Sequence, residues 1–166
     1  MVGEETVRLA QLFPDSATAG EALRARGWTV AVAESCTGGL LGAALTAVPG
    51  SSGYVRGGVI AYDNAVKTGL LGVDAGLLAG HGAVSEEVAA AMARGVRERL
   101  HADVGVGITG VAGPGTEEGG KPAGLVYVAV ATPEAERVVR LEGDHGREGN
   151  RAAAVAAALT VLVDMA

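Results

Sequence analysis

The sequence has 166 residues, a formal net charge of −6 and one cysteine. The single cysteine excludes an internal disulfide, and the negative net charge disfavours a nucleic-acid-binding surface. That length fits one domain, here 1–166, and 49% hydrophobic residues with few aromatic side chains favour a core of Val, Leu, Ile and Ala. The acidic N-terminus lacks a signal-peptide core and no apolar run has membrane-spanning length, so we expect a cytoplasmic protein.

Helical and strand patterns alternate along the chain in the manner of an α/β protein. Pro14 and Gly27 break two early helical patterns. Ser85, followed by two glutamates, is a strong helix start, and the buried stripe expected on that helix is Val88, Met92, Val96 and Leu100. We expect helices at 4–12, 16–26, 38–48, 64–80 (in short pieces), 85–100 and 147–164, and strands at 28–33, 55–62, 104–109, 124–131 and 136–142.

The last two predicted strands are separated by only four residues, 132–135, which indicates a hairpin and therefore an antiparallel pair. The earlier strands are separated by helical segments, which is typical of parallel pairing. The sequence predicts a single three-layer α/β/α domain with a mixed, mostly parallel sheet.

The turn after the first strand is the most informative segment of the chain. Glu34, Ser35, Cys36 and Thr37 follow a buried apolar run, and two glycines then open a helix. Backbone N–H groups at such a turn favour negative charge, either a phosphate or the oxyanion of acyl transfer. Helix capping is the more common reason for a serine or threonine at such a position, but one helix needs only one cap and this turn offers four small or polar residues.

Two further segments carry candidate functional groups. Lys67 and Lys121 are the only lysines beside eleven arginines, and Lys67 follows an apolar strand, so it is the better candidate for a neutral base. The glycine-rich segment 107–116 leaves a strand and can bring backbone N–H groups close to a ligand.

The carboxyl ends of neighbouring strands are where ligands bind in open α/β sheets. Ser35, Tyr62 and Thr109 end the first three predicted strands, and these ends indicate one site.

Other motifs are dismissed on their context. Residues 105–110 match a dinucleotide fingerprint but lie inside a strand, and 115–121 match a P-loop opening without its Ser or Thr. The three histidines lack metal-ligand spacing and are expected at the surface or in caps. Cys36 has no histidine partner in the sequence and is interpreted as a small buried filler.

Three motifs together resemble the CinA C-terminal domain family: 33–39 (Ala-Glu-Ser-Cys-Thr-Gly-Gly), 57–67 and 107–114, in the family order. The resemblance covers about residues 5–164. It implies the family fold and, for the enzymatic members, hydrolysis of nicotinamide mononucleotide to nicotinate mononucleotide and ammonia. By its length the chain resembles the stand-alone amidase form, and we expect it to lack the additional N-terminal domain of larger CinA proteins.

The resemblance implies that Ser35, Tyr62 and Lys67 act together in catalysis, with Lys67 accepting the serine proton directly or through Tyr62. It implies neither metal nor cofactor. Oxyanion and substrate contacts are expected from Glu34, Cys36, Thr37, Gly38, Gly39, Thr109, Gly110 and Gly113.

Arg147 and Arg151, one helical turn apart, are the candidates for the substrate phosphate, although 143–147 contains an apparent two-residue insertion relative to the family's Gly-Asp-Arg. Glu34 has three open roles: to offset a pyridinium charge, to bond a ribose hydroxyl, or to orient Lys67.

Two other functions stay open, a non-catalytic module associated with competence or recombination and an amidase for another nucleotide-like amide. No nucleic acid or membrane partner is expected. The many Ala and Gly positions favour close helix contacts and a homodimer.

Overall fold

The computed structural model describes residues 8–166, which form a three-layer α/β/α domain around one five-stranded sheet. The expected fold is confirmed. The strands are β1 (Val30–Glu34), β2 (Val55–Ile60), β3 (Val104–Gly110), β4 (Val126–Ala131) and β5 (Glu136–Leu141). The helices are α1 (Leu9–Leu12), α2 (Asp15–Arg26), α3 (Leu40–Thr46), α4 (Asn64–Gly69), α5 (Ala75–His81), α6 (Glu86–Arg99) and α7 (Gly146–Met165), with a 3₁₀ turn η1 at Ser51–Gly53.

The sheet is mixed, with the strand order β2-β1-β3-β4-β5. β1 pairs in parallel with both β2 and β3, whereas β4 is antiparallel to β3 and to β5. The β4–β5 connection is the expected hairpin, closed by a hydrogen bond from Thr132 N to Ala135 O. The three parallel strands therefore bring their carboxyl ends to one edge of the sheet.

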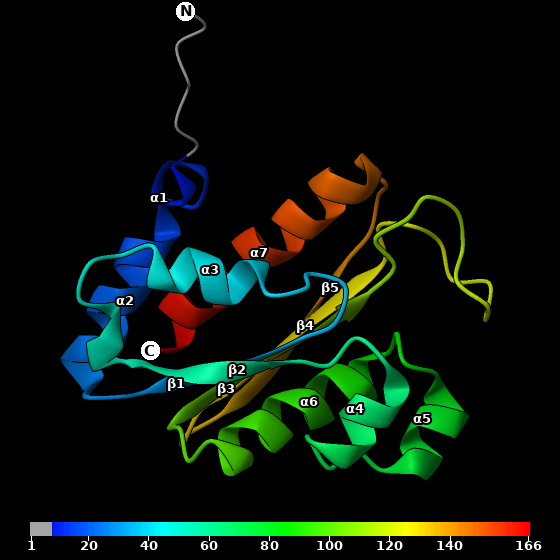
Figure 1. Cartoon of the computed structure of the whole chain (residues 1–166), viewed down its shortest axis with the longest axis horizontal. Coiled ribbons are helices and arrows are strands. Elements are labelled where there is room, and N and C mark those ends of the chain that lie inside the picture. Colours follow the sequence, from blue (N-terminus) through cyan, green and yellow to red (C-terminus); the bar gives the residue numbers. More distant parts are fainter. Residues whose placement is uncertain (1–7) are drawn as a thin grey trace, which may run out of the picture.

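Alternate side chains of β1 serve two different cores, because successive residues of a strand point to opposite faces. Val30 and Val32 pack with α2, α3 and α7 on one face, whereas Ala31 and Ala33 pack with α4, α5 and α6 on the other. Figure 1 shows these two helical layers above and below the sheet. Glu34 continues the first series and points toward α3.

Helix α6 lies unusually close to β3, and glycines make this approach possible. A Cβ atom on Gly105 would lie 2.0 Å from the Ala93 carbonyl oxygen, and one on Gly107 would lie 2.4 Å from that of Ala89. The glycines that imitate a dinucleotide fingerprint thus serve helix–sheet packing. Val88, Met92 and Val96 of α6 are fully buried, as their spacing predicts.

Several element bounds differ from those expected. The predicted helix at 4–12 is described only over Leu9–Leu12, and its residues 4–7 lie outside the described part. The predicted helix at 38–48 starts at Leu40, because Gly39 has a left-handed φ of 102° and caps it.

The first strand begins at Val30 rather than at Trp28, whose amide still donates to the Leu23 carbonyl at the end of α2. Among residues 8–166, no helix has the length and apolar character needed to cross a membrane.

Candidate active site

Ser35 lies directly after β1, in the short turn that leads to α3. Its amide donates to the Ile108 carbonyl of β3 over 2.9 Å, so the neighbouring strand fixes the residue in place. The side chain is only 8% exposed and lines a cavity of about 320 Å³ at the carboxyl edge of the parallel strands. That position combines access to a ligand with a backbone that cannot shift easily.

Lys67 reaches the same cavity from α4, a helix capped by the side chain of Asp63. Its Nζ lies 3.0 Å from Ser35 Oγ, 2.7 Å from the Ala61 carbonyl and 3.2 Å from the Tyr62 carbonyl. The residue is 1% exposed and makes no ion pair within residues 8–166. Burial lowers the pKa of the Lys67 ammonium below its usual value of 10.5, because a charge without water is disfavoured.

The three oxygen contacts of Lys67 Nζ fit both protonation states of the amine, since an ammonium can donate to all three oxygens. A neutral Nζ has two N–H groups and one lone pair. The Ala61 and Tyr62 carbonyls can only accept, so they take the two N–H groups. In the ammonium form Nζ donates to Ser35 Oγ over 3.0 Å, and in the neutral form its lone pair faces the Ser35 hydroxyl, which then donates to it. The geometry thus suits removal of the serine proton by Lys67 without an intermediary.

Tyr62 contributes to this site in a way that the sequence did not indicate. Its carbonyl holds Lys67, but its phenol hydroxyl lies 3.3 Å from a guanidinium nitrogen of Arg147, and the residue is 61% exposed. The Tyr62 hydroxyl has no hydrogen bond to Ser35 or Lys67 among the described residues. The structure therefore favours the direct route over the relay through Tyr62.

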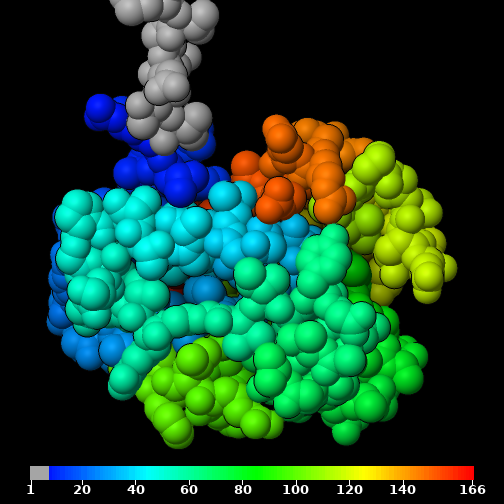
Figure 2. Space-filling model, in the orientation of Figure 1, coloured from blue at the N-terminus to red at the C-terminus, as the bar shows by residue number. Residues whose placement is uncertain are grey.

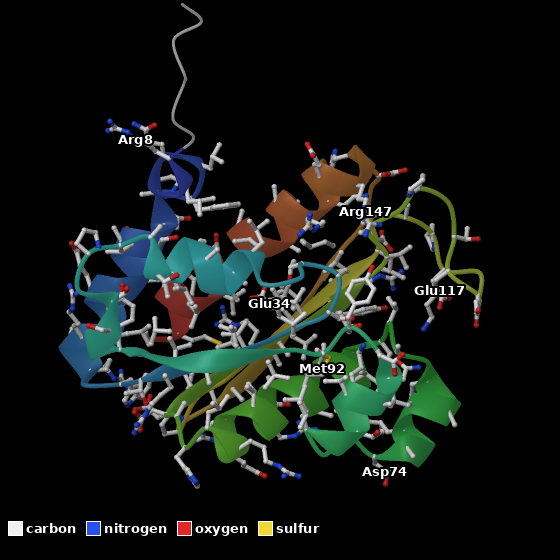
Figure 3. The ribbon with its side chains drawn as sticks, viewed as in Figure 1. Arg8, Glu34, Asp74, Met92, Glu117 and Arg147 are labelled. Carbon is white, nitrogen blue, oxygen red and sulfur yellow. The ribbon has the colours of Figure 1, made fainter. Side chains whose placement is uncertain are left out.

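The two arginines proposed for the phosphate are used differently. Arg147 lines the cavity and donates from Nη1 to the Gly113 carbonyl over 2.6 Å. Arg151 instead donates to the Thr37 carbonyl over 3.1 Å, and so holds the turn after Ser35. Figure 3 shows Arg147 at the start of α7, beside the loop that carries Glu117. Only Arg147 of the pair is placed to meet a ligand in the cavity.

Glu34 is buried between β1 and α3, as Figure 3 shows, and does not line the cavity. Its two carboxylate oxygens accept from the Leu41 amide over 2.8 Å and from the Gly42 amide over 3.0 Å. These are amides of the first turn of α3, which otherwise lack partners. The expected roles toward a pyridinium, a ribose or Lys67 are therefore wrong, since Glu34 anchors the helix that follows Ser35.

The hydrogen bonds of the turn after Ser35 exclude some of the expected oxyanion donors. The Gly38 amide donates to the Ser35 carbonyl and is already used. The Cys36 and Thr37 amides make no backbone hydrogen bond within residues 8–166. Gly39 lies over Ile60 and, like Thr37, is not part of the cavity lining, which leaves the Cys36 amide as the candidate donor of this turn within the lining.

The glycine-rich segment forms the opposite wall of the cavity, with Thr109, Gly110 and Gly113 all lining it. The Thr109 hydroxyl donates to the Ala83 carbonyl over 2.8 Å, so this side chain fixes the wall rather than offering a free donor. Lys121 fixes the same region by donating to the His81 and Val84 carbonyls.

Burial raises the pKa of the Cys36 thiol to about 11, which keeps it protonated near neutral pH. This agrees with its interpretation as a buried filler. Within the described residues, no three His, Cys, Asp or Glu side chains gather where they could bind a metal ion.

Sequence reasoning missed several residues of the site. Asn64, Ala83, Val84 and Glu117 also line the cavity, and Val111, Ala112 and Pro114 line it within the glycine-rich segment that was predicted only as a whole. Asn150, which is buried behind it, was missed as well, although a polar amide inside an Ala-rich helix was a visible signal.

The family model for the CinA C-terminal domain matches residues 14–166. The chain belongs to this family. A CinA-like protein from Gloeobacter violaceus is 54% identical over 149 residues, which cover 88% of this chain and 35% of that protein. A CinA-like protein from Synechocystis is 60% identical over 134 residues, covering 78% of this chain and 32% of that protein. The chain thus spans about a third of the length of the curated relatives it matches.

Solved structures of the CinA family are similar over nearly their whole length. The competence/damage inducible protein CihA from Agrobacterium tumefaciens is 37% identical, with a TM-score of 0.87 and 96% of each chain covered. A competence-damaged protein (CinA) superfamily protein from Escherichia coli is 32% identical, with a TM-score of 0.90, covering 98% of this chain and 94% of that one.

Proposed function

We propose that this CinA-family protein hydrolyses the carboxamide of nicotinamide mononucleotide, giving nicotinate mononucleotide and ammonia, for the recycling of pyridine nucleotides. The observation that carries the proposal is the 3.0 Å contact between the Ser35 hydroxyl and the buried Lys67 amine. Amide hydrolysis needs a nucleophile, a base and oxyanion donors, and the cavity supports all three. Its volume of about 320 Å³ lies in the range of small-ligand sites.

In the first half of the proposed reaction, Ser35 Oγ attacks the carboxamide carbon while Lys67 Nζ takes the hydroxyl proton. The Cys36 amide is the proposed donor to the oxyanion that forms on the carbonyl oxygen. Lys67 then gives its proton to the departing nitrogen. The C–N bond breaks, ammonia leaves and an acyl-Ser35 ester remains.

In the second half, water attacks the ester carbon and Lys67 accepts a proton from that water. The Ser35 oxygen leaves and takes the proton back, which restores the enzyme and releases the carboxylic acid. We propose that Arg147 binds the substrate phosphate, because its guanidinium lines the cavity and offers the fork geometry that phosphate accepts.

Incubation of the purified protein with nicotinamide mononucleotide, followed by measurement of ammonia and nicotinate mononucleotide, tests this proposal. Stoichiometric formation of both products supports it. Absence of turnover would favour the non-catalytic competence-associated module. Turnover of other nucleotide-like amides alone would favour the second amidase alternative. Nicotinamide riboside is the matched substrate that lacks only the phosphate. The cytoplasmic location and the homodimer stay predictions.

A further inference from the structure

Asn150 is a buried polar residue in the first turns of α7 that the proposed chemistry does not use. It is 2% exposed, and the helix around it is rich in alanine. Asparagine is a poor helix former, and a buried amide without partners costs free energy. A leucine would serve packing better, so the hydrogen bonds of the amide explain its presence.

The Asn150 side chain joins three separate pieces of backbone and side chain. Its Oδ1 accepts from the His145 amide over 2.8 Å, and its Nδ2 donates to the Ala112 carbonyl over 3.0 Å and to Asp144 Oδ1 over 2.9 Å. The same Asp144 oxygen accepts from the Gly146 amide over 3.0 Å. The segment before α7, the start of the helix and the glycine-rich segment are therefore linked through one amide group.

Arg147 lies one helical turn before Asn150 and contacts the next residue of the same segment. Asn150 holds the carbonyl of Ala112, and Arg147 holds the carbonyl of Gly113. Two side chains a turn apart on α7 thus grip two consecutive carbonyls. Figure 2 shows the start of α7 (orange) beside the loop that continues this segment (yellow-green).

Close backbone packing between Gly124 and Gly143 supports the same junction from the other side. A Cβ atom on Gly124 would lie 2.2 Å from the Gly143 carbonyl oxygen, so the residues just before β4 pack directly against the segment before α7. Movement of residues 143–146 is thereby limited on one side by Gly124 and on the other by Asn150.

We propose that Asn150 is a positioning residue that joins the start of α7 to residues 110–114 of the glycine-rich segment and thereby holds the Arg147 guanidinium at the rim of the cavity. The effect of Asn150 on phosphate recognition rests on the proposed function. The linkage of α7 to the glycine-rich segment does not depend on it. Arg147 is exposed, and a long exposed side chain binds more weakly when its backbone is free to move.

The test compares Asn150→Leu with Val155→Ala, a core substitution on the same helix that lowers stability without touching the junction. With nicotinamide mononucleotide, Asn150→Leu should raise KM about tenfold and change kcat less than about threefold, since a contact to the phosphate weakens in ground and transition state alike. With the riboside, kcat/KM should stay within about twofold. Val155→Ala should preserve the ratio of the two substrates.

A second comparison separates positioning from a general structural role. When Arg147→Ala is combined with Asn150→Leu, kcat/KM for the mononucleotide should fall no further than with Arg147→Ala alone, because both changes remove one contact. Additive losses would overturn the inference, as would an equal loss on both substrates in Asn150→Leu.

Hydrogen exchange of the ligand-free proteins gives a readout that needs no activity. Asn150→Leu should accelerate exchange at 111–113 and at 145–147 relative to Val155→Ala at matched stability. Unchanged protection at both segments would overturn the inference. If the wild-type protein shows no turnover while this local change is seen, the proposed function fails and the linkage by Asn150 stands.

Discussion

The amino and carboxyl ends of the parallel strands each hold one ionisable side chain with a shifted pKa, but only the one at the amino end is surrounded by groups that stabilise its charged form. At the amino end, just before β1 and β3, Asp103 Oδ2 accepts from the Thr29 amide over 2.8 Å and from the Thr29 hydroxyl over 2.9 Å. These hydrogen bonds, the amide first, hold the pKa of Asp103 below its usual value. At the carboxyl end, Lys67 is buried beside hydroxyl and carbonyl oxygens, without a carboxylate partner in the described residues.

The difference separates a charge that stabilises the fold from one that is available for chemistry. A carboxylate with donors around it is stabilised in its charged form and has little tendency to exchange protons near neutral pH. A buried lysine with a lowered pKa approaches the range in which a base can take and return a proton. Perturbed groups in a cavity are candidates for function on this ground.

The largest expected effect is on Ser35. Ser35→Ala should lower ammonia release from nicotinamide mononucleotide at least about a thousandfold, because no other hydroxyl lies beside Lys67 Nζ within the described residues. The thermal midpoint should change by only a few degrees. Ser52→Ala, an exposed serine outside the cavity, is the matched control and should keep full activity. Substantial activity in Ser35→Ala would remove the nucleophile from the proposal.

The next effect concerns the charge of Lys67. Lys67→Arg should be nearly as damaging as Lys67→Ala, with at least a tenfold loss of turnover, equivalent to ~1.4 kcal/mol, because a guanidinium cannot accept the serine proton. In the wild type, kcat/KM should rise with pH through an ionisation below 10.5, since the neutral amine is the active form. An arginine variant that keeps most of the rate would assign Lys67 to anchoring a substrate anion instead.

The position of the candidate site at the carboxyl ends of the parallel strands could be predicted from the sequence. Ser35, Tyr62 and Thr109 lie at the ends of the three parallel strands, and strand periodicity was enough to bring them to one edge. The preference for lysine over arginine at position 67 pointed to a proton-transfer role. These features follow from local pattern and from the general position of sites in α/β sheets.

The directions of the side chains at the same edge could not be predicted from the sequence. Glu34 turns away from the cavity because it continues the β1 face that packs on α3, where two helix amides need acceptors. Arg151 turns to the Thr37 carbonyl, and the Tyr62 hydroxyl turns to Arg147 rather than to Ser35. Each choice depends on contacts between segments far apart in the chain, which no local pattern specifies.

A smaller effect is expected at the amino end, on stability rather than activity. Asp103→Asn should lower the free energy of unfolding at pH 7 by about 1 kcal/mol, a value reduced for partial exposure. The folded-state pKa of Asp103 is depressed, so its contribution is present above pH 3.8 and is lost as pH falls through the folded pKa. Urea denaturation of both proteins at pH 7 and at a series of pH values falling from 3.8 measures this difference.

Two comparisons make the Asp103 prediction specific. Asp164→Asn, which removes an exposed pair with Arg137 at 3.6 Å, should change stability by less than about 0.5 kcal/mol. Ammonia release should be unchanged in Asp103→Asn when the protein is folded. A loss of activity without loss of stability would show that the two ends of the sheet are coupled, contrary to the division of roles described above.

The smallest effect is expected from substitution of Cys36, which adjoins Ser35. Burial favours the reactive form of Lys67 but disfavours the reactive form of Cys36. Burial lowers the Lys67 pKa toward the useful range but raises that of the Cys36 thiol to about 11, away from the reactive thiolate. Cys36→Ala should therefore change initial rates less than about threefold, and thiol-specific reagents should react faster only as pH approaches 11. A loss in Cys36→Ala as large as that predicted for Ser35→Ala, with Ser35→Ala still active, would transfer the nucleophile to the thiol.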